Sequence, residues 1–173
     1  VDIYEFNTKR FMYTGTTKAA YQVYVNEGVD VDESVDVWNK QIQDAFDFAG
    51  LKDDKSDPTN DSTNVRTTVR LMQPYAAGDH VGIQRHIQEI ALRTDQDSIN
   101  SILWGMIHEV GHQMDISSRE LGEITNNMFS NNAYMKNNAG DRVPYNELYN
   151  LLAPDDSSQN FDDISYSQRL GMF

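Results

Sequence analysis

Two long stretches of the chain carry apolar residues at helical spacing, and the first of them, residues 32–50, contains Val35, Trp38, Ile42, Ala45, Phe46 and Ala49. The second stretch contains Ile99, Ile102, Leu103, Met106, Ile107, Val110 and Met114. At about 100° per residue each set forms a single stripe, so we predict two amphipathic helices whose stripes face the core. Asp32 is the expected cap of the first helix, and Gly50 ends it. For the second helix the expected cap is Asp97 or Ser98.

Shorter stretches of the chain predict strands. Residues 65–75 alternate between apolar and polar positions, which is typical of a half-buried strand, until Pro74 and Gly78 break the pattern. Extended structure resumes at Val81–Ile83. The apolar run Ile87–Leu92 is a further candidate strand.

The N-terminal region is rich in tyrosine and phenylalanine. Within it, residues 17–26 are predicted to form a short helix closed by Gly28. We expect the aromatic side chains of residues 1–30 to fill the core rather than to form a carbohydrate-facing surface. The acidic segment 52–63 lacks the ordered aspartate spacing of a calcium loop, so it is predicted to be a solvated connection.

A second capping signal follows the helix that contains Met114. Ser117 and Glu120 fit a capping box, in which a serine and a glutamate three residues later satisfy backbone groups at a helix start. The helix that follows is predicted to bury Leu121, Ile124, Met128 and Met135. Its other face carries polar residues at i, i+3, i+4 and i+7, namely Glu123, Asn126, Asn127 and Ser130. Beyond it the sequence predicts a turn, a short helix and the start of another helix, at 137–144, 145–152 and 163–173.

Together these elements predict one domain of the α+β class, helix-rich with a small sheet. Residues 1–63 are expected to form an N-terminal helical part, 64–93 the small sheet, and 97–173 a second helical part. A chain of 173 residues is long enough for one domain with a substantial core. The chain starts Val-Asp-Ile-Tyr and ends Arg-Leu-Gly-Met-Phe, so we expect both ends to be cuts within a longer protein.

The composition argues against several classes of protein. The net charge is −13, whereas binding to phosphate backbones needs clustered lysine and arginine, so we expect no nucleic-acid partner. The same acidity disfavours an anionic membrane surface, and no apolar run reaches the roughly 18 residues that a membrane span needs, so no membrane insertion is expected. Because the chain has no cysteine, it can form neither a disulfide nor a thiolate metal site.

The second long helix contains the His-Glu-x-x-His pattern of zinc metallopeptidases, with His108 and His112 four residues apart and Glu109 between them. On a helix this spacing places both imidazoles on one side, where the neighbouring carboxylate can reach a water held by a metal. Ser101 and Gly105 fall on the same face, opposite the apolar stripe. The alternative is a helix with two exposed or hydrogen-bonded histidines. The intervening glutamate and the location away from the core favour a pair of zinc ligands.

A catalytic zinc needs a third protein ligand and an open position for water. Because cysteine is absent, this ligand is a carboxylate or one of the two remaining histidines, His80 and His86. Glu120 already has a structural role at the predicted helix start, whereas Glu123 lies on the polar face of a helix that can pack across the first one. The capping argument therefore favours Glu123 over Glu120, with the two histidines as further alternatives.

Other residues are candidates for supporting roles. Asn126 and Asn127 lie about one turn beyond Glu123, where they would orient the ligands, contact the substrate, or form a solvated helix face. His80 is a candidate for a substrate contact or for an oxyanion donor. Further candidates for the oxyanion donor are Tyr134, Tyr145 and Tyr166. The segment 75–84 is the candidate edge strand that pairs with an extended substrate backbone.

Four segments, taken together, resemble the enhancin-like zinc metallopeptidases, the family of viral enhancins and bacterial mucin-degrading peptidases. In chain order they are Tyr75-Ala-Ala-Gly-Asp-His80-Val-Gly-Ile83, Trp104-Gly105, His108-Glu-Val-Gly-His112-Gln113 and Glu123-Ile-Thr-Asn-Asn127-Met-Phe-Ser130. The last two segments are the specific ones, because they combine the histidine motif with a glutamate at a short interval. The resemblance covers residues 65–173 well and the N-terminal third loosely.

The resemblance implies a zincin-like fold of the gluzincin type, with His108, His112 and Glu123 as zinc ligands and Glu109 as the catalytic base. It also implies a secreted or cell-surface peptidase that acts on mucins or other O-glycosylated proteins. Members of the family are often joined to carbohydrate-binding modules. They usually continue beyond the helix expected at 163–173, so any substrate-binding residues located there would lie outside this chain.

The expected reaction follows from these assignments. Zinc would lower the pKa of its bound water towards about 7 and polarise the scissile carbonyl, while Glu109 takes the water proton and delivers it to the leaving amine. One alternative is a non-catalytic glycoprotein-binding module on the same scaffold, which would not need Glu109. Another is a structural zinc protein, in which His80 or His86 would close the ligand shell.

Overall fold

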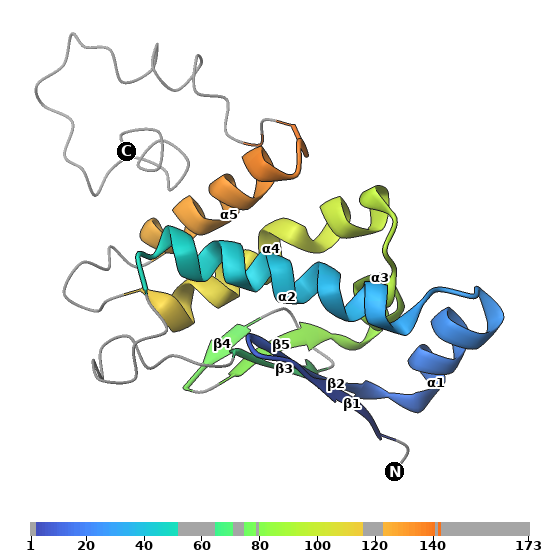
Figure 1. Cartoon of the computed structure of the whole chain (residues 1–173). Coiled ribbons are helices and arrows are strands. Elements are labelled where there is room, and N and C mark those ends of the chain that lie inside the picture. The colour runs from blue at the N-terminus through green and yellow to red at the C-terminus, as the bar shows by residue number, and fades with distance from the viewer. Residues whose placement is uncertain are drawn as a thin grey trace, which may run out of the picture.

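The computed structural model of the chain describes residues 3–51, 65–70, 75–78, 80–115, 123–140 and 142. Within these ranges the chain forms a five-stranded mixed sheet with helices packed over one face (Figure 1). The strands are β1 (Ile3–Asn7), β2 (Phe11–Thr16), β3 (Val65–Arg70), β4 (Tyr75–Ala77) and β5 (His80–Gln84). The main helices are α2 (Val31–Phe48), α4 (Gln96–Met114) and α5 (Thr125–Lys136). Shorter helical segments are α1 (Thr17–Ala20), the π-helix η1 (Tyr21–Asn26), the 3-10 helix η3 (Arg85–Ile87) and α3 (Gln88–Leu92).

The sheet has the strand order β1-β2-β3-β5-β4, which leaves β4 at one edge. The outer pairs β1–β2 and β4–β5 are antiparallel, and the inner pairs β2–β3 and β3–β5 are parallel. In the β4–β5 register Ala76 is opposite Val81. Val81 is fully buried and α4 contacts both strands, so Ala76 lies on the helix-covered face of the sheet. This packing brings the sheet edge beside α4.

The apolar stripes of the two long helices form the centre of the core, as the sequence predicts. All seven stripe residues of α4 are buried, and Trp38 of α2 is only 1% exposed. The indole Nε1 of Trp38 donates a hydrogen bond of 2.7 Å to the Ala91 carbonyl oxygen, which satisfies its one polar atom inside the core. Because its stripe is buried, α4 directs its opposite face, which carries the histidines, towards the β4 edge and α5.

The two long helices begin slightly before the positions that the sequence predicts. Asp30, rather than Asp32, caps α2, with its carboxylate accepting from the Glu33 backbone N–H at 2.9 Å. Asp95, rather than Asp97 or Ser98, caps α4 by accepting from the Ser98 backbone N–H at 2.9 Å. Several aspartates are available at each start, and the structure uses the one whose backbone is still extended, so that its carboxylate reaches the N–H three residues later.

Two predictions about the sheet were wrong. The N-terminal part, 1–63, is not purely helical, because β1 and β2 join the sheet, which therefore extends well beyond 64–93. Phe11 and Tyr13 alternate with less buried neighbours along β2, which is the period-two pattern of a half-buried strand. The run Ile87–Leu92 is helical, not a strand, because a short apolar run does not by itself distinguish the two.

Other expectations for the N-terminal region are confirmed. Residues 17–26 are helical, and Gly28 follows with a φ of 76° that favours glycine. Phe11 and Tyr13 are fully buried, although Tyr21 is an exposed exception. Strands are also confirmed at 65–70 and 80–84.

Several predicted elements lie outside the described residues: the acidic loop 52–63, the capping box 117–120 and the segments after 142. None of the helices within the described ranges is long and apolar enough to cross a bilayer.

Candidate metal centre

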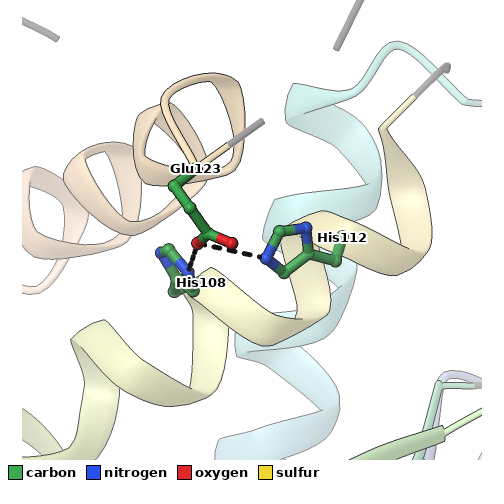
Figure 2. A group of neighbouring side chains, drawn as sticks. All are labelled: His108, His112 and Glu123. Carbon is green, nitrogen blue, oxygen red and sulfur yellow. Dashed lines mark hydrogen bonds and ion pairs between the residues drawn. The ribbon is translucent and has the colours of Figure 1, made fainter. Parts of the chain in front are cut away.

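His108 and His112 project from α4 towards Glu123, which lies in the turn immediately before α5 (Figure 2). The Glu123 Oε2 atom is 2.8 Å from His108 Nε2 and 3.4 Å from His112 Nε2. One ligand-type atom from each of the three residues lies within 4.8 Å of the others. The structure therefore brings together two imidazole nitrogens and one carboxylate oxygen from segments that are more than ten residues apart.

Two asparagines of α5 surround the imidazoles. The Asn127 Oδ1 atom accepts a hydrogen bond of 2.7 Å from His108 Nδ1. Because an amide oxygen only accepts, this bond fixes a proton on Nδ1 and turns Nε2 towards Glu123 and His112. The Asn126 amide nitrogen is 2.9 Å from His108 Nε2 and 2.7 Å from His112 Nε2. Both amides thus contact the histidines.

The buried side of α5 is mixed, whereas the sequence predicts an apolar one: the polar Asn126 and Ser130 are buried together with Phe129 and Ala133. Asn126 and Ser130 are fully buried, whereas Met135, predicted to be buried, is 68% exposed. The Ser130 hydroxyl donates to the Trp104 carbonyl oxygen at 2.9 Å. Hydrogen bonds to α4 thus engage the Ser130 hydroxyl and the Asn126 amide nitrogen, whereas the buried Asn126 Oδ1 atom has no hydrogen-bond partner among the described residues. The full burial of Asn126 excludes its interpretation as a solvated helix residue. Ile124 is buried as predicted.

A glycine allows the two helices to approach closely at the site. A Cβ atom added to Gly111 would lie 3.0 Å from the Asn126 Cβ and 3.1 Å from its Cα and carbonyl oxygen. Two of these three atoms belong to the backbone of α5, so they cannot move aside by a change of rotamer. The glycine between Glu109 and His112 therefore sets how near α5 and Glu123 come to the histidines.

We expect the substitution Gly111→Ala to lower both stability and metal affinity. Alanine gains up to about 1 kcal/mol in helix propensity, but overpacking against a backbone costs about 1–3 kcal/mol, so the free energy of unfolding should fall by up to about 2 kcal/mol. Denaturant unfolding and a competitive zinc titration would measure the two effects. Stability and zinc affinity equal to those of the unmodified protein would contradict this role of Gly111.

Glu109 lies at the wall of an open cavity of about 530 Å³ beside the sheet edge. The cavity is lined by Tyr75, Ala76, Ala77, Gly78, Glu109, His112, Gln113 and Glu123. It is thus bounded on one side by the edge strand β4 and on the other by the histidine-bearing face of α4. Glu109 also makes a hydrogen bond with the Ala76 backbone. An extended peptide paired with the edge of β4 would lie beside the cavity that Glu109, His112 and Glu123 line.

The pKa values of the two carboxyl groups at the site, Glu109 and Glu123, are shifted in opposite directions. Burial raises the pKa of Glu109, an effect that the nearby Glu123 carboxylate reinforces and the two imidazoles oppose. Burial would also raise the pKa of Glu123, but the hydrogen bond with His108 and the adjacent imidazoles outweigh it, so the pKa of Glu123 is lowered. Glu123 therefore favours the ionised form, and Glu109 is the better proton acceptor.

The other residues singled out from the sequence lie elsewhere or outside the described residues. His80 is on β5, where its Nε2 atom is 2.9 Å from the Tyr75 hydroxyl, and His86 is in η3. Within the described ranges, neither belongs to the group formed by the three candidate ligands. The Tyr134 hydroxyl donates to the Asn100 carbonyl oxygen at 3.2 Å and does not line the cavity. Glu120, Tyr145 and Tyr166 lie outside the described residues.

The segment 75–84, predicted as the edge strand beside the substrate, forms two strands, of which β4 lies at the sheet edge and places Ala76 and Ala77 in the cavity lining. The sequence gives no indication that Gln113 lines the cavity. Gln113 follows His112 directly and lies beside the histidine face, where helical periodicity gives no specific signal.

An α+β fold in which a histidine-bearing helix lies beside an edge strand is the architecture of a zincin-like metallopeptidase domain, as predicted from the sequence. The chain belongs to the family described as peptidase M60, enhancin and enhancin-like, whose sequence profile matches residues 1–158. No curated protein matches the chain in sequence.

Solved structures of similar fold include a conserved protein of unknown function from Bacillus anthracis, with a TM-score of 0.79 and 17% identity over 97% of this chain and 36% of that one. The M60 catalytic domain region of Clostridium perfringens ZmpB, solved with two CBM32 domains, has a TM-score of 0.75 and 22% identity over 99% of this chain and 18% of that one. The M60 catalytic domain of C. perfringens ZmpC in complex with the sialyl T antigen has a TM-score of 0.64 and 24% identity, over 79% and 26%. The chain therefore spans about a third or less of each of these proteins.

Proposed function

We propose that this chain is the zinc-binding part of a secreted or cell-surface peptidase that hydrolyses peptide bonds in mucin-type or other O-glycosylated proteins. The observation that carries the proposal is the convergence of His108, His112 and Glu123 beside Glu109 at the wall of one cavity. Membership of a metallopeptidase family supports the same reading.

The donor set fits zinc. Two imidazole nitrogens and one carboxylate oxygen are the ligands of many catalytic zinc sites, which keep a fourth position for water. The three atoms lie close enough together to share one ion, and the cavity beside them provides access to solvent. His108, His112 and Glu123 would hold the metal, and Asn127 would fix the tautomer and orientation of His108.

The bound zinc would supply a Lewis acid that activates water and polarises the scissile carbonyl. Glu109 accepts the proton of the attacking water and transfers it to the leaving amine. Its raised pKa strengthens it as a base, and its hydrogen bond with the Ala76 backbone holds it against the strand along which the substrate would lie. The edge of β4 would orient the substrate by pairing with its extended backbone.

The substrate class is proposed from the neighbouring structures and from the form of the cavity. The ZmpC catalytic domain has been solved with the sialyl T antigen, and ZmpB has been solved with CBM32 domains. In this chain the cavity opens to solvent, and its lining on the side of β4 includes small residues, namely Ala76 and Ala77 of the strand and Gly78 of the following turn. Carbohydrate-binding modules outside this chain are proposed as its partners in the longer protein.

Two other functions use the same scaffold. A non-catalytic glycoprotein-binding module would not require a base, so the location of Glu109 at the cavity beside the candidate ligands favours the peptidase. A structural zinc site would need a fourth protein ligand. Among the described residues the group of ligand-type side chains has three members, His108, His112 and Glu123. His80 forms a hydrogen bond with the Tyr75 hydroxyl instead.

Asn127→Ala is expected to weaken zinc binding without removing a ligand. Loss of the hydrogen bond to His108 Nδ1 frees the tautomer and orientation of the ring, and such changes typically cost about 10–100-fold in metal affinity. A competitive titration with a chromogenic chelator would measure the change. Asn131→Ala, in the following turn of α5, is the control, and an unchanged zinc affinity in Asn127→Ala would contradict the positioning role.

Digestion of a glycosylated mucin, followed by mass spectrometry of the products, tests the function as a whole. The protein that contains this chain should release peptides in a zinc-dependent manner, with cleavage sites next to glycosylated serine or threonine. The enzymatically deglycosylated mucin is the control. Binding to mucin without any cleavage would support the binding module and contradict the peptidase.

A further inference from the structure

A second cavity, of about 390 Å³, lies where α1 and α3 meet, away from the metal centre. In Figure 1, α1 and α3 are at one end of the sheet and β4 is at the other. The cavity is lined by Thr16, Lys18, Ala19, Arg85, His86, Gln88 and Glu89. The assigned chemistry of the chain does not use these residues.

The floor of this cavity is held in place by Gln88. Its side chain is 3% exposed, and its Oε1 atom accepts from both the backbone N–H and the hydroxyl of Thr16, each at 3.0 Å. Its Nε2 atom donates to the Arg85 carbonyl oxygen at 2.8 Å. The hydrogen bonds of Gln88 thus connect the end of β2 to the start of α3. The position of the cavity wall is therefore set by main-chain groups and a buried side chain.

The rim of the cavity is basic, although the chain as a whole is strongly acidic. The chain has 14 lysine and arginine residues against 27 aspartate and glutamate residues, yet Lys18, Arg85 and His86 all line this cavity with exposed side chains. In the part of the chain that the structure describes, none of these three side chains takes part in an ion pair. The lining also contains one acidic residue, Glu89; the neighbouring Arg93 makes its ion pair with Glu27.

We propose that this cavity is a binding site for the acidic group of a sugar, either the carboxylate of a sialic acid or a sulfate ester. Arg85 offers a planar fork of N–H donors to paired anionic oxygens, Lys18 offers a mobile positive charge, and His86 offers a ring N–H. Neutral hydroxyl groups of the sugar would form hydrogen bonds with polar side chains at the rim of the cavity. The choice of sugars rests on the proposed function. The site would bind an acidic branch of a glycosylated substrate at a distance from the cleaved bond.

Isothermal titration of the zinc-loaded protein with 3′-sialyllactose, with lactose 3′-sulfate and with lactose tests this site. The two acidic sugars should bind, more weakly at high salt, and lactose should not. The double variant Lys18→Ala/Arg85→Ala should lose on the order of tenfold in affinity, because two exposed charged contacts are removed. The substituted side chains are exposed and the Gln88 bonds use the Arg85 main chain, so thermal unfolding should be unchanged.

The control variant is Lys40→Ala/Lys136→Ala, which also removes two positive charges but changes lysines that pair with Asp44 on another surface. It should keep the affinity of the unmodified protein. Binding of only one acidic sugar would support the site and show whether it recognises the sialic acid carboxylate or the sulfate ester. Equal binding of lactose, no binding of either acidic sugar, or equal loss in the control variant would overturn the proposal. The assay measures no proteolysis, so a negative result here leaves the peptidase proposal standing.

Discussion

Glu109→Gln is expected to lose peptide hydrolysis by about 10²–10⁴-fold while keeping one zinc per chain. The amide has nearly the same shape as the carboxylate but cannot accept the proton of the attacking water. Glu109 is not among the three converging ligand-type residues, so its substitution should leave the metal site intact. Zinc content by inductively coupled plasma mass spectrometry and initial rates on a glycosylated peptide would measure the two properties.

Gln113→Glu is the informative companion to this variant. It places a carboxylate on the same cavity wall but not at the position of Glu109. It should not restore hydrolysis when combined with Glu109→Gln. Full activity of Glu109→Gln, or its loss of zinc, would contradict the role of a general base that stands apart from the ligands.

Glu123→Ala should lose zinc and, with it, hydrolysis. The side chain provides the oxygen atom that lies 2.8 Å from His108 Nε2. Loss of an outer hydrogen-bond partner alone costs about 10–100-fold in metal affinity, so removal of a ligand should cost more than about 100-fold. The measurement is a competitive zinc titration, with stability checked by denaturant unfolding of the metal-free protein.

The control for Glu123→Ala is Glu33→Ala, which removes an exposed glutamate from the first turn of α2, remote from the site. This control variant should bind zinc normally. Glu123→Asp is a further comparison, because it keeps the charge but shortens the side chain by one methylene, so its zinc affinity should also fall. Unchanged zinc affinity in Glu123→Ala would show that another group provides the third ligand.

The core of the fold was predictable because it depends on helical periodicity. In α4 the whole apolar stripe is buried, and the opposite face carries the histidines. The same signal placed Trp38 correctly in α2. The N-terminal strands and the helical run at Ile87–Leu92 were not predicted correctly, because segments of five or six residues show too few periods to decide between strand and helix.

The arrangement of α5 shows a second limit of sequence patterns. The polar residues Asn126 and Ser130 face α4, and the apolar Met135 faces solvent. Burial of a polar face depends on partners that the sequence does not reveal, here the two imidazoles and the Trp104 carbonyl oxygen. The sequence nevertheless indicated Glu123, although the helix starts at Thr125 and Glu123 is in the preceding turn rather than on its face.

The most direct test of the proposed zinc site is an anomalous difference map, recorded at the zinc edge, from crystals of the zinc-loaded protein. We expect one peak about 2.0–2.2 Å from His108 Nε2, His112 Nε2 and a Glu123 carboxylate oxygen, with the remaining position facing the cavity beside Glu109. A peak elsewhere, or a zinc at the two histidines with the Glu123 side chain turned away from it, would contradict the proposed site.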